Sequence, residues 1–249
     1  QEARALNSMG RTDEGEVLVG RAQKGAEQHG WLFIAALADR EDGFLKLNKG
    51  DTAGAIASYR QAYEGFEPFE ATAERAECLL GIGRAYHFRH EIVPAREHLE
   101  AAIAAQREVR DNFGLGQSLK NLANVFQHMG DHAAAVDCLE QAQRTFEAHG
   151  YRFNVGAVLN DLGETWRAHG HLDEAEHCYR EAAAIFDSVG SNNSTPRLNL
   201  GLLQLNRRRF DEAENVFQRE RRRCEAVGGL LELPWLYAGL LACAAARLE

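Results

Sequence analysis

The chain lacks the features that define several large classes of protein. Its apolar runs fall short of the roughly 18 residues that a membrane span needs, and no stretch alternates apolar and polar residues as a half-buried strand does. Its net charge of −9 gives no basic field to attract nucleic acid or an acidic membrane surface. These absences argue against membrane and nucleic acid as partners and leave a helical chain of ordinary soluble composition.

Cysteine is scarce, with five residues and no CxxC pair. Cys138 and Cys178 occupy the same place in two successive, similar segments. Equivalent helices in a stack lie about 8–10 Å apart, which exceeds the Cα separation of about 7 Å that a disulfide tolerates. We therefore expect buried, reduced thiols and a reducing, cytoplasmic compartment.

Motifs of catalysis and cofactor binding are also missing. The sequence has no phosphate-binding glycine loop, no nucleophile elbow and no paired-carboxylate motif. Its ten histidines invite a metal site, but no grouping has the spacing of a closed zinc site, so we interpret them as surface or helix-capping residues. We predict that the protein is not an enzyme and has no cofactor and no metal.

What the chain does have is a repeat of forty residues. Equivalent positions at intervals of forty residues are Gly10, Gly50, His90, Gly130 and Gly170. The next one is Arg208, because the last interval is two residues shorter. We call these six residues the repeat boundaries. Small residues recur five positions after each boundary and large apolar residues nine positions after it. A fixed period of this kind indicates stacked structural repeats.

Within each repeat, apolar residues recur at steps of three and four, which is typical of amphipathic helices. Leu119, Leu122 and Phe126 form one such face, and Ala135, Leu139, Ala142 and Phe146 form the next. We therefore predict one all-α domain over residues 1–249, built from stacked antiparallel helix hairpins. It should hold about six helix pairs and a C-terminal helix near 231–247.

One repeat resembles a known family. Its Leu159, Leu162-Gly163, Trp166, Ala175, Tyr179 and Ala182 follow the order of the tetratricopeptide repeat. That repeat has a standard period of about 34 residues, and Glu147 and Asp187 stand where it has Pro. The longer period is similar to the subtype of kinesin light chains, Pins-type adaptors and many bacterial regulators. The resemblance implies an all-α, right-handed superhelical solenoid (TPR-like). It also implies peptide binding in a groove lined by the first helix of each hairpin.

Polar side chains between the packing positions of those first helices are the candidate binding residues. An Asn amide can pair with the N–H and C=O groups of a bound backbone. The Pins-like resemblance implies this role for an Asn before Leu-Gly, which Asn121 and Asn199 match and Asp161 and Gly81 do not. The alternative is a solvated, exposed face. The predicted groove residues are Arg84, His87, Lys120, Asn121, Asn124, Gln127, Asn160, Asp161, Glu164, Arg167 and Asn199.

Two of the first helices depart from the pattern. Asp39 and Asp42 stand where the repeat requires apolar residues. Either these helices are rotated from the assumed register, which we favour, or the ends of the groove are apolar and grip a partner. The apolar residues that fall on the expected groove face are Leu37, Phe44 and Leu47 in one helix and Leu198, Leu202 and Leu205 in the other.

One basic cluster follows near the C-terminal end, at 207–209, 219 and 221–223. It could meet an acidic partner or a nucleic acid backbone. Glu212, Glu214, Glu220 and Glu225 are interspersed with it. This mixture favours a solvated outer helix face.

The predicted function is a non-catalytic scaffold that binds a peptide or protein segment, with self-association left open. The alternative is a sensory or regulatory repeat module of a larger bacterial transcription activator or Ser/Thr kinase. Gln1 opens a helical pattern without Met or a signal peptide, so we expect that the sequence was trimmed from a longer chain.

Overall fold

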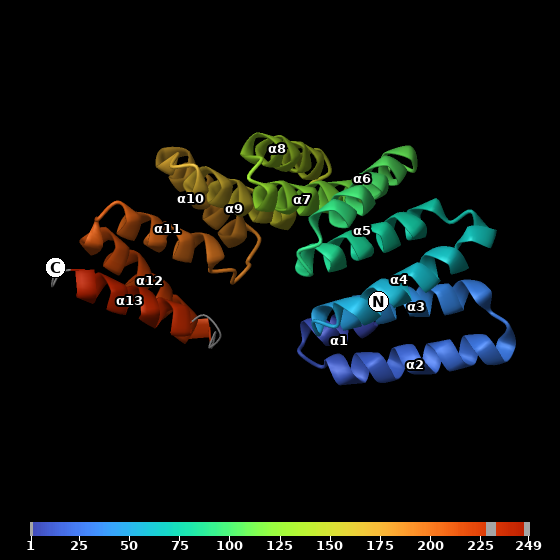
Figure 1. Cartoon of the computed structure of the whole chain (residues 1–249). Coiled ribbons are helices and arrows are strands. Elements are labelled where there is room, and N and C mark those ends of the chain that lie inside the picture. Colours follow the sequence, from blue (N-terminus) through green and yellow to red (C-terminus); the bar gives the residue numbers. More distant parts are fainter. Residues whose placement is uncertain (1, 228–232, 247–249) are drawn as a thin grey trace. The chain divides into compact units, whose positions relative to one another are not determined.

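The computed structural model describes residues 2–227 and 233–246, and every regular element in these ranges is helical (Figure 1). The all-α prediction is confirmed. The chain divides into two compact units, residues 1–131 and 132–249, which are described separately; a single domain over 1–249 stays a prediction. No helix within the described ranges combines the length and the apolar character required to cross a bilayer.

The first unit is a run of helices in which each packs against the next in sequence. Pro68 lies in the short 3₁₀ helix η1, where the missing proline N–H prevents α4 from continuing. The helices are α1 (Glu2–Ser8), α2 (Thr12–His29), α3 (Leu32–Asn48), α4 (Thr52–Gly65), η1 (Glu67–Phe69), α5 (Thr72–Phe88), α6 (Ile92–Glu108) and α7 (Asn112–Met129).

The second unit continues the same succession of helices. The C-terminal helix predicted near 231–247 is α13; positions 231, 232 and 247 lie outside the described residues. The helices are α8 (His132–Ala148), α9 (Arg152–Ala168), α10 (Leu172–Ser188), α11 (Thr195–Asn206), α12 (Phe210–Val227) and α13 (Leu233–Ala246).

All six repeat boundaries adopt the left-handed backbone conformation, with φ between 57° and 85°. At each of them the next N–H bonds to the carbonyl oxygen five residues earlier, as from Asp131 to Phe126 (2.9 Å). This is the hydrogen bond that ends a helix in a Schellman motif. Glycine adopts the conformation freely, whereas at His90 and Arg208 it costs about 1–2 kcal/mol. The forty-residue period is therefore a period of helix ends.

The interior of the first unit is organised around Tyr59, which is 4% exposed. A Cβ atom at Gly43 of α3 would lie 2.9 Å from the Tyr59 ring, and one at Gly81 of α5 would lie 2.4 Å from it. Both distances are shorter than real Cβ contacts allow. The Tyr59 ring therefore lies as a wedge between α3 and α5. These helices can approach the ring because Gly43 and Gly81 have no side chain.

The same arrangement recurs in the second unit. Phe217 of α12 is 1% exposed. Cβ atoms at Gly201 of α11 and Gly239 of α13 would lie 2.4 and 2.7 Å from its ring. The large apolar residue nine positions after a repeat boundary is thus the wedge that spaces neighbouring helices in both units.

The favoured rotation of α3 is wrong. Because Gly43 keeps its place against the aromatic wedge, Asp39 and Asp42 remain at packing positions. Asp39 is 8% exposed and accepts a hydrogen bond from Gln23 Nε2 (2.9 Å). Ser58 Oγ donates to Asp42 (2.6 Å). Polar partners on α2 and α4 therefore replace the apolar contacts of the other repeats.

The leucines assigned to the groove face divide between core and surface. Leu47 is 3% exposed, and Leu198 and Leu205 pack against the cluster around Phe217, so a groove position is wrong for these three. Leu202 is 47% exposed. An exposed apolar groove end, the other alternative, is therefore wrong for three of the six residues.

Gly81→Ala tests the close approach of α5 to Tyr59. The added methyl group would meet three ring carbons at 2.4–2.7 Å. We expect the free energy of unfolding to fall by about 1–3 kcal/mol through overpacking, measured by chemical denaturation with circular dichroism detection. The control is Gly20→Ala in α2, which has no atom within 4 Å and should be neutral or gain up to about 1 kcal/mol. Equal effects of the two substitutions would contradict the wedge.

Candidate functional site

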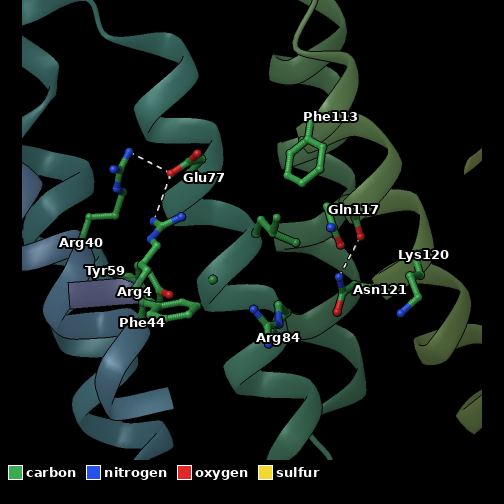
Figure 2. Close-up of a pocket in the computed structure, with 13 residues that line it drawn as sticks. Arg4, Arg40, Phe44, Tyr59, Glu77, Arg84, Phe113, Gln117, Lys120 and Asn121 are labelled. Carbon is green, nitrogen blue, oxygen red and sulfur yellow. Dashed lines mark hydrogen bonds and ion pairs between the residues drawn. The ribbon is translucent and has the colours of Figure 1, made fainter. Parts of the chain in front are cut away.

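A hollow of about 300 Å³ lies in the first unit, lined by residues of α1, α3, α5 and α7, with Tyr59 of α4 at one side (Figure 2). It contains three of the eleven predicted groove residues. Its lining residues are Arg4, Arg40, Phe44, Tyr59, Glu77, Leu80, Gly81, Arg84, Phe113, Gly114, Gln117, Lys120 and Asn121.

Ion pairs join three helices at one side of this hollow. Arg4 Nε lies 2.7 Å from Glu41 Oε2, and Arg40 Nη1 lies 2.8 Å from Glu77 Oε2 (Figure 2 shows the second pair). Arg4 also reaches Glu77 at 3.5 Å. Burial raises the pKa of Glu41, but the hydrogen bond and the charge of Arg4 outweigh this and hold that pKa below its ordinary value. The carboxylates therefore neutralise Arg4 and Arg40.

Further basic and polar side chains line the rest of the hollow. Arg84 is half-buried and has no ion-pair or hydrogen-bond partner among the residues that the structure describes. Lys120 and Asn121 follow on α7, and the Asn121 side chain is oriented by a hydrogen bond from its Nδ2 to the Gln117 carbonyl oxygen (2.7 Å). The three predicted residues in this hollow thus form one basic and polar group.

Apolar side chains complete the hollow. Phe44 packs under the Arg4 guanidinium, with 5.0 Å from Cζ to the ring centroid. Leu80 and Phe113 also line it, and Phe113 is 44% exposed. The hollow therefore offers both charge and apolar surface to a ligand.

The other predicted residues of the first unit lie outside the hollow. His87 shares a hydrogen bond with His128 (Nε2 to Nδ1, 3.0 Å), and the ring of His90 lies 5.8 Å from that of His128. Asn124 and Gln127 are half-buried on α7. Histidines from the ends of α5 and α7 are therefore brought together, which sequence spacing did not predict.

In the second unit, Asn160, Glu164 and Asn199 bond to one another. Asn199 Nδ2 donates to Asn160 Oδ1 (2.9 Å) and to Glu164 Oε1 (3.1 Å). Asn160 is 7% exposed, so its amide serves contact between α9 and α11. Asp161 is half-buried and Arg167 is exposed. The expected exposed polar face is therefore wrong for Asn160.

Sequence reasoning missed several lining residues, although the repeat contained the signal. Phe44 and Arg4 lie forty and eighty positions before Arg84, and Leu80 and Arg40 stand in the same relation to Lys120. The groove face expected from the sequence already included Phe44. Applying the positions of Arg84 and Lys120 to the other first helices would have added Arg4, Arg40 and Leu80. Glu77 and Gln117 occupy a further repeat position that the prediction did not use.

Within the ranges that the structure describes, the histidines and cysteines form neither a metal site nor a reactive thiol centre. In the described part of the chain, no group of three or more His, Cys, Asp or Glu residues is arranged to hold a metal ion. All five cysteines are buried and form no disulfide, which confirms the prediction of buried, reduced thiols. Burial raises the pKa of Cys78 to about 12 and that of Cys178 to about 11, so these thiols stay protonated and unreactive at neutral pH.

Residues 114–188 match the tetratricopeptide repeat family. The regulatory protein AfsR of Streptomyces griseus is 29% identical over 147 residues, which is 59% of this chain and 14% of that protein. The chain therefore spans a small part of this curated relative.

Two solved structures show the same fold. The signal transduction ATPase with a tetratricopeptide repeat sensor from Pyrococcus horikoshii has a TM-score of 0.77 at 14% identity, covering 99% of this chain and 37% of that one. The Rap conjugation gene regulator of plasmid pLS20, solved with the Phr* peptide, has a TM-score of 0.66 at 18% identity, covering 82% and 57%. Residues 114–188 thus match the tetratricopeptide repeat, as the resemblance implied, and the likeness of fold to these solved proteins extends over most of the chain.

We predict that the protein loses stability in acid because His87 lies against His128. Burial, and then the charges of His128 and His90, lower the pKa of His87. In the unfolded chain that pKa is about 6.5, so the unfolded state takes up a proton at higher pH than the folded state. The contribution of His87 to the free energy of unfolding is therefore fully present above about pH 6.5 and is lost as the pH falls below it.

Denaturant titrations between about pH 8 and pH 5 measure this loss. In His87→Gln the free energy of unfolding should fall less steeply with decreasing pH, because glutamine takes up no proton in place of His87. Parallel curves for the original chain and the variant would exclude His87 as the source.

Proposed function

We propose that the first unit is a binding module for an extended peptide, and that Arg84 and Lys120 recognise an acidic side chain of that peptide. The observation that carries this proposal is the half-buried Arg84, which has no counter-ion among the described residues yet lies in a hollow. Guanidinium groups bind carboxylates through paired, charge-assisted hydrogen bonds. The protein acts as a scaffold without catalysis.

Charge favours an acidic ligand over a basic one. Four basic side chains and one acidic side chain line the hollow. Counting Glu41, which pairs with Arg4, leaves a formal charge of 4 − 2 = +2. This local excess opposes the net charge of −9 of the whole chain. An acidic segment is therefore attracted to this hollow and repelled by much of the remaining surface.

The neutral lining residues suit the rest of such a peptide. The amides of Gln117 and Asn121 have both donor and acceptor atoms for a peptide backbone. Phe44, Leu80 and Phe113 offer apolar contact to a neighbouring side chain. The Rap regulator solved with a peptide has the same fold, which supports peptide binding as the mode of recognition.

A second proposal concerns the larger protein. AfsR is a regulatory protein, and the repeats of the Pyrococcus protein are a sensor attached to an ATPase. These likenesses support a role for this chain as the sensory repeat module of a larger bacterial regulator. A kinase, ATPase or DNA-binding segment in the same gene would support the sensor, and its absence would favour the scaffold. Free, buried thiols support a cytoplasmic location.

Binding of a peptide library tests the acidic-peptide proposal. Fluorescence anisotropy with acidic, neutral and basic peptides of equal length should rank the acidic set first. Arg84→Gln combined with Lys120→Gln should weaken that binding by about 10-fold or more, because each lost charge-assisted bond contributes about 1.5–3 kcal/mol.

The matched control is Lys24→Gln combined with Arg144→Gln, which removes two exposed positive charges outside the hollow. It should bind as the original chain does. The proposal fails if both double variants weaken binding equally, or if neutral and basic peptides bind as well as acidic ones.

A further inference from the structure

A carboxylate interrupts a set of fully buried alanines. The residues twelve positions after four of the repeat boundaries are Ala62, Ala102, Ala142 and Ala182, and each is 0% exposed. The equivalent residue in α12 is Glu220, which is 3% exposed. Burying an ionised carboxylate costs free energy unless it is paired and hydrogen-bonded. Packing alone gives no reason for glutamate at this position.

The protein satisfies this carboxylate only in part. Glu220 Oε2 lies 3.6 Å from Arg197 Nε, and Oε1 lies 4.0 Å from Arg223 Nη1. Both separations exceed hydrogen-bond distance. Oε1 has no hydrogen-bond partner. A buried acceptor therefore lacks a donor.

Glu220 lines a hollow of about 600 Å³ in the second unit, among α10, α11 and α12. Its apolar lining consists of Ala183, Ala184, Leu200 and Val216. The volume falls in the range of roughly 300–1,000 Å³ that is typical of small-molecule pockets. This hollow is separate from the proposed peptide site, which lies wholly in the first unit.

Four arginines surround this second hollow, with Asp187 and Glu220 as its acidic residues. Arg197 and Arg223 both reach Asp187 Oδ1, at 2.6 and 3.1 Å. Arg180 pairs with Glu176. Arg219 has neither an ion pair nor a hydrogen bond in the described part of the chain. The sequence predicted a solvated outer helix face for the basic cluster. Two of its arginines, Arg219 and Arg223, instead line this hollow.

We propose that this hollow binds a small phosphate ester that carries hydroxyl groups, in the manner of a sugar phosphate. Arginine is suited to phosphate oxygens, and Arg219 is available for that contact. A ligand hydroxyl would donate to Glu220 Oε1, as sugar hydroxyls do to acidic residues in dinucleotide sites. The carbon skeleton would lie against the alanines and Leu200. A bare anion or an uncharged sugar would use only half of these groups.

Isothermal titration of the full 249-residue chain with ribose 5-phosphate tests the proposal. Inorganic phosphate and ribose are the comparison ligands. We expect ribose 5-phosphate to bind about 10-fold or more tightly than either of them. Equal binding of inorganic phosphate would mean an unspecific anion site, and no binding at all would mean no site; either result overturns the proposal.

Two variants separate the phosphate contact from the hydroxyl contact. Arg219→Gln should weaken ribose 5-phosphate binding by about 10-fold. Its control, Arg222→Gln, removes an exposed arginine of the same helix that does not line the hollow and should change nothing. Equal effects of these two variants would contradict the site.

Glu220→Ala restores the residue that the other repeats have at this position. It should keep the helical circular dichroism signal and the binding of inorganic phosphate, and lose the advantage of ribose 5-phosphate over phosphate. If that advantage persists in the folded variant, Glu220 does not bind the hydroxyl group and the proposal is wrong. If the variant unfolds, the comparison of Arg219→Gln with Arg222→Gln still decides.

Discussion

The contact between one aromatic ring and two glycines sets the spacing of helices in the first unit. Tyr59 lies against Gly43 and Gly81, and neither position has room for a Cβ atom. Because the wedge fixes how α3 and α5 flank α4, it also fixes which side chains of α3 and α5 face outward. Gly81 and Tyr59 themselves line the peptide hollow. Packing and candidate function therefore meet at the same residues.

Apart from Gly81 and Tyr59, the residues that give the hollow its charge are not the residues that space the helices. The wedge and its glycines keep the repeat regular, whereas Arg84 and Lys120 give the hollow its charge. At Glu220, as at Asp39, a packing position itself has changed to a carboxylate, and at Glu220 the residue replaced is alanine. A departure from the repeat at a buried position is the more informative kind, because its cost must be offset by some other interaction.

The sequence predicted those parts of the structure that depend on local chain geometry. The repeat boundaries were found because a left-handed residue must follow each first helix, and glycine occupies four of these six positions. Contacts across helices were not predictable: Arg4 meets Glu41 and Glu77 over 37 and 73 residues. Asp39 was misjudged because its polar partner, Gln23, lies on another helix. Arg84, Lys120 and Asn121 were found because each lies between the packing positions of its own helix, α5 or α7.

A double-mutant cycle of Gly81→Ala with Tyr59→Leu tests the wedge most directly. Leucine lacks the ring atoms that the alanine methyl group would meet at 2.4–2.7 Å. If the ring sets the helix spacing, Gly81→Ala should destabilise the Tyr59→Leu chain less than it destabilises the original chain, with a coupling free energy of about 1 kcal/mol or more. Strictly additive losses of stability would contradict the wedge as the organising contact.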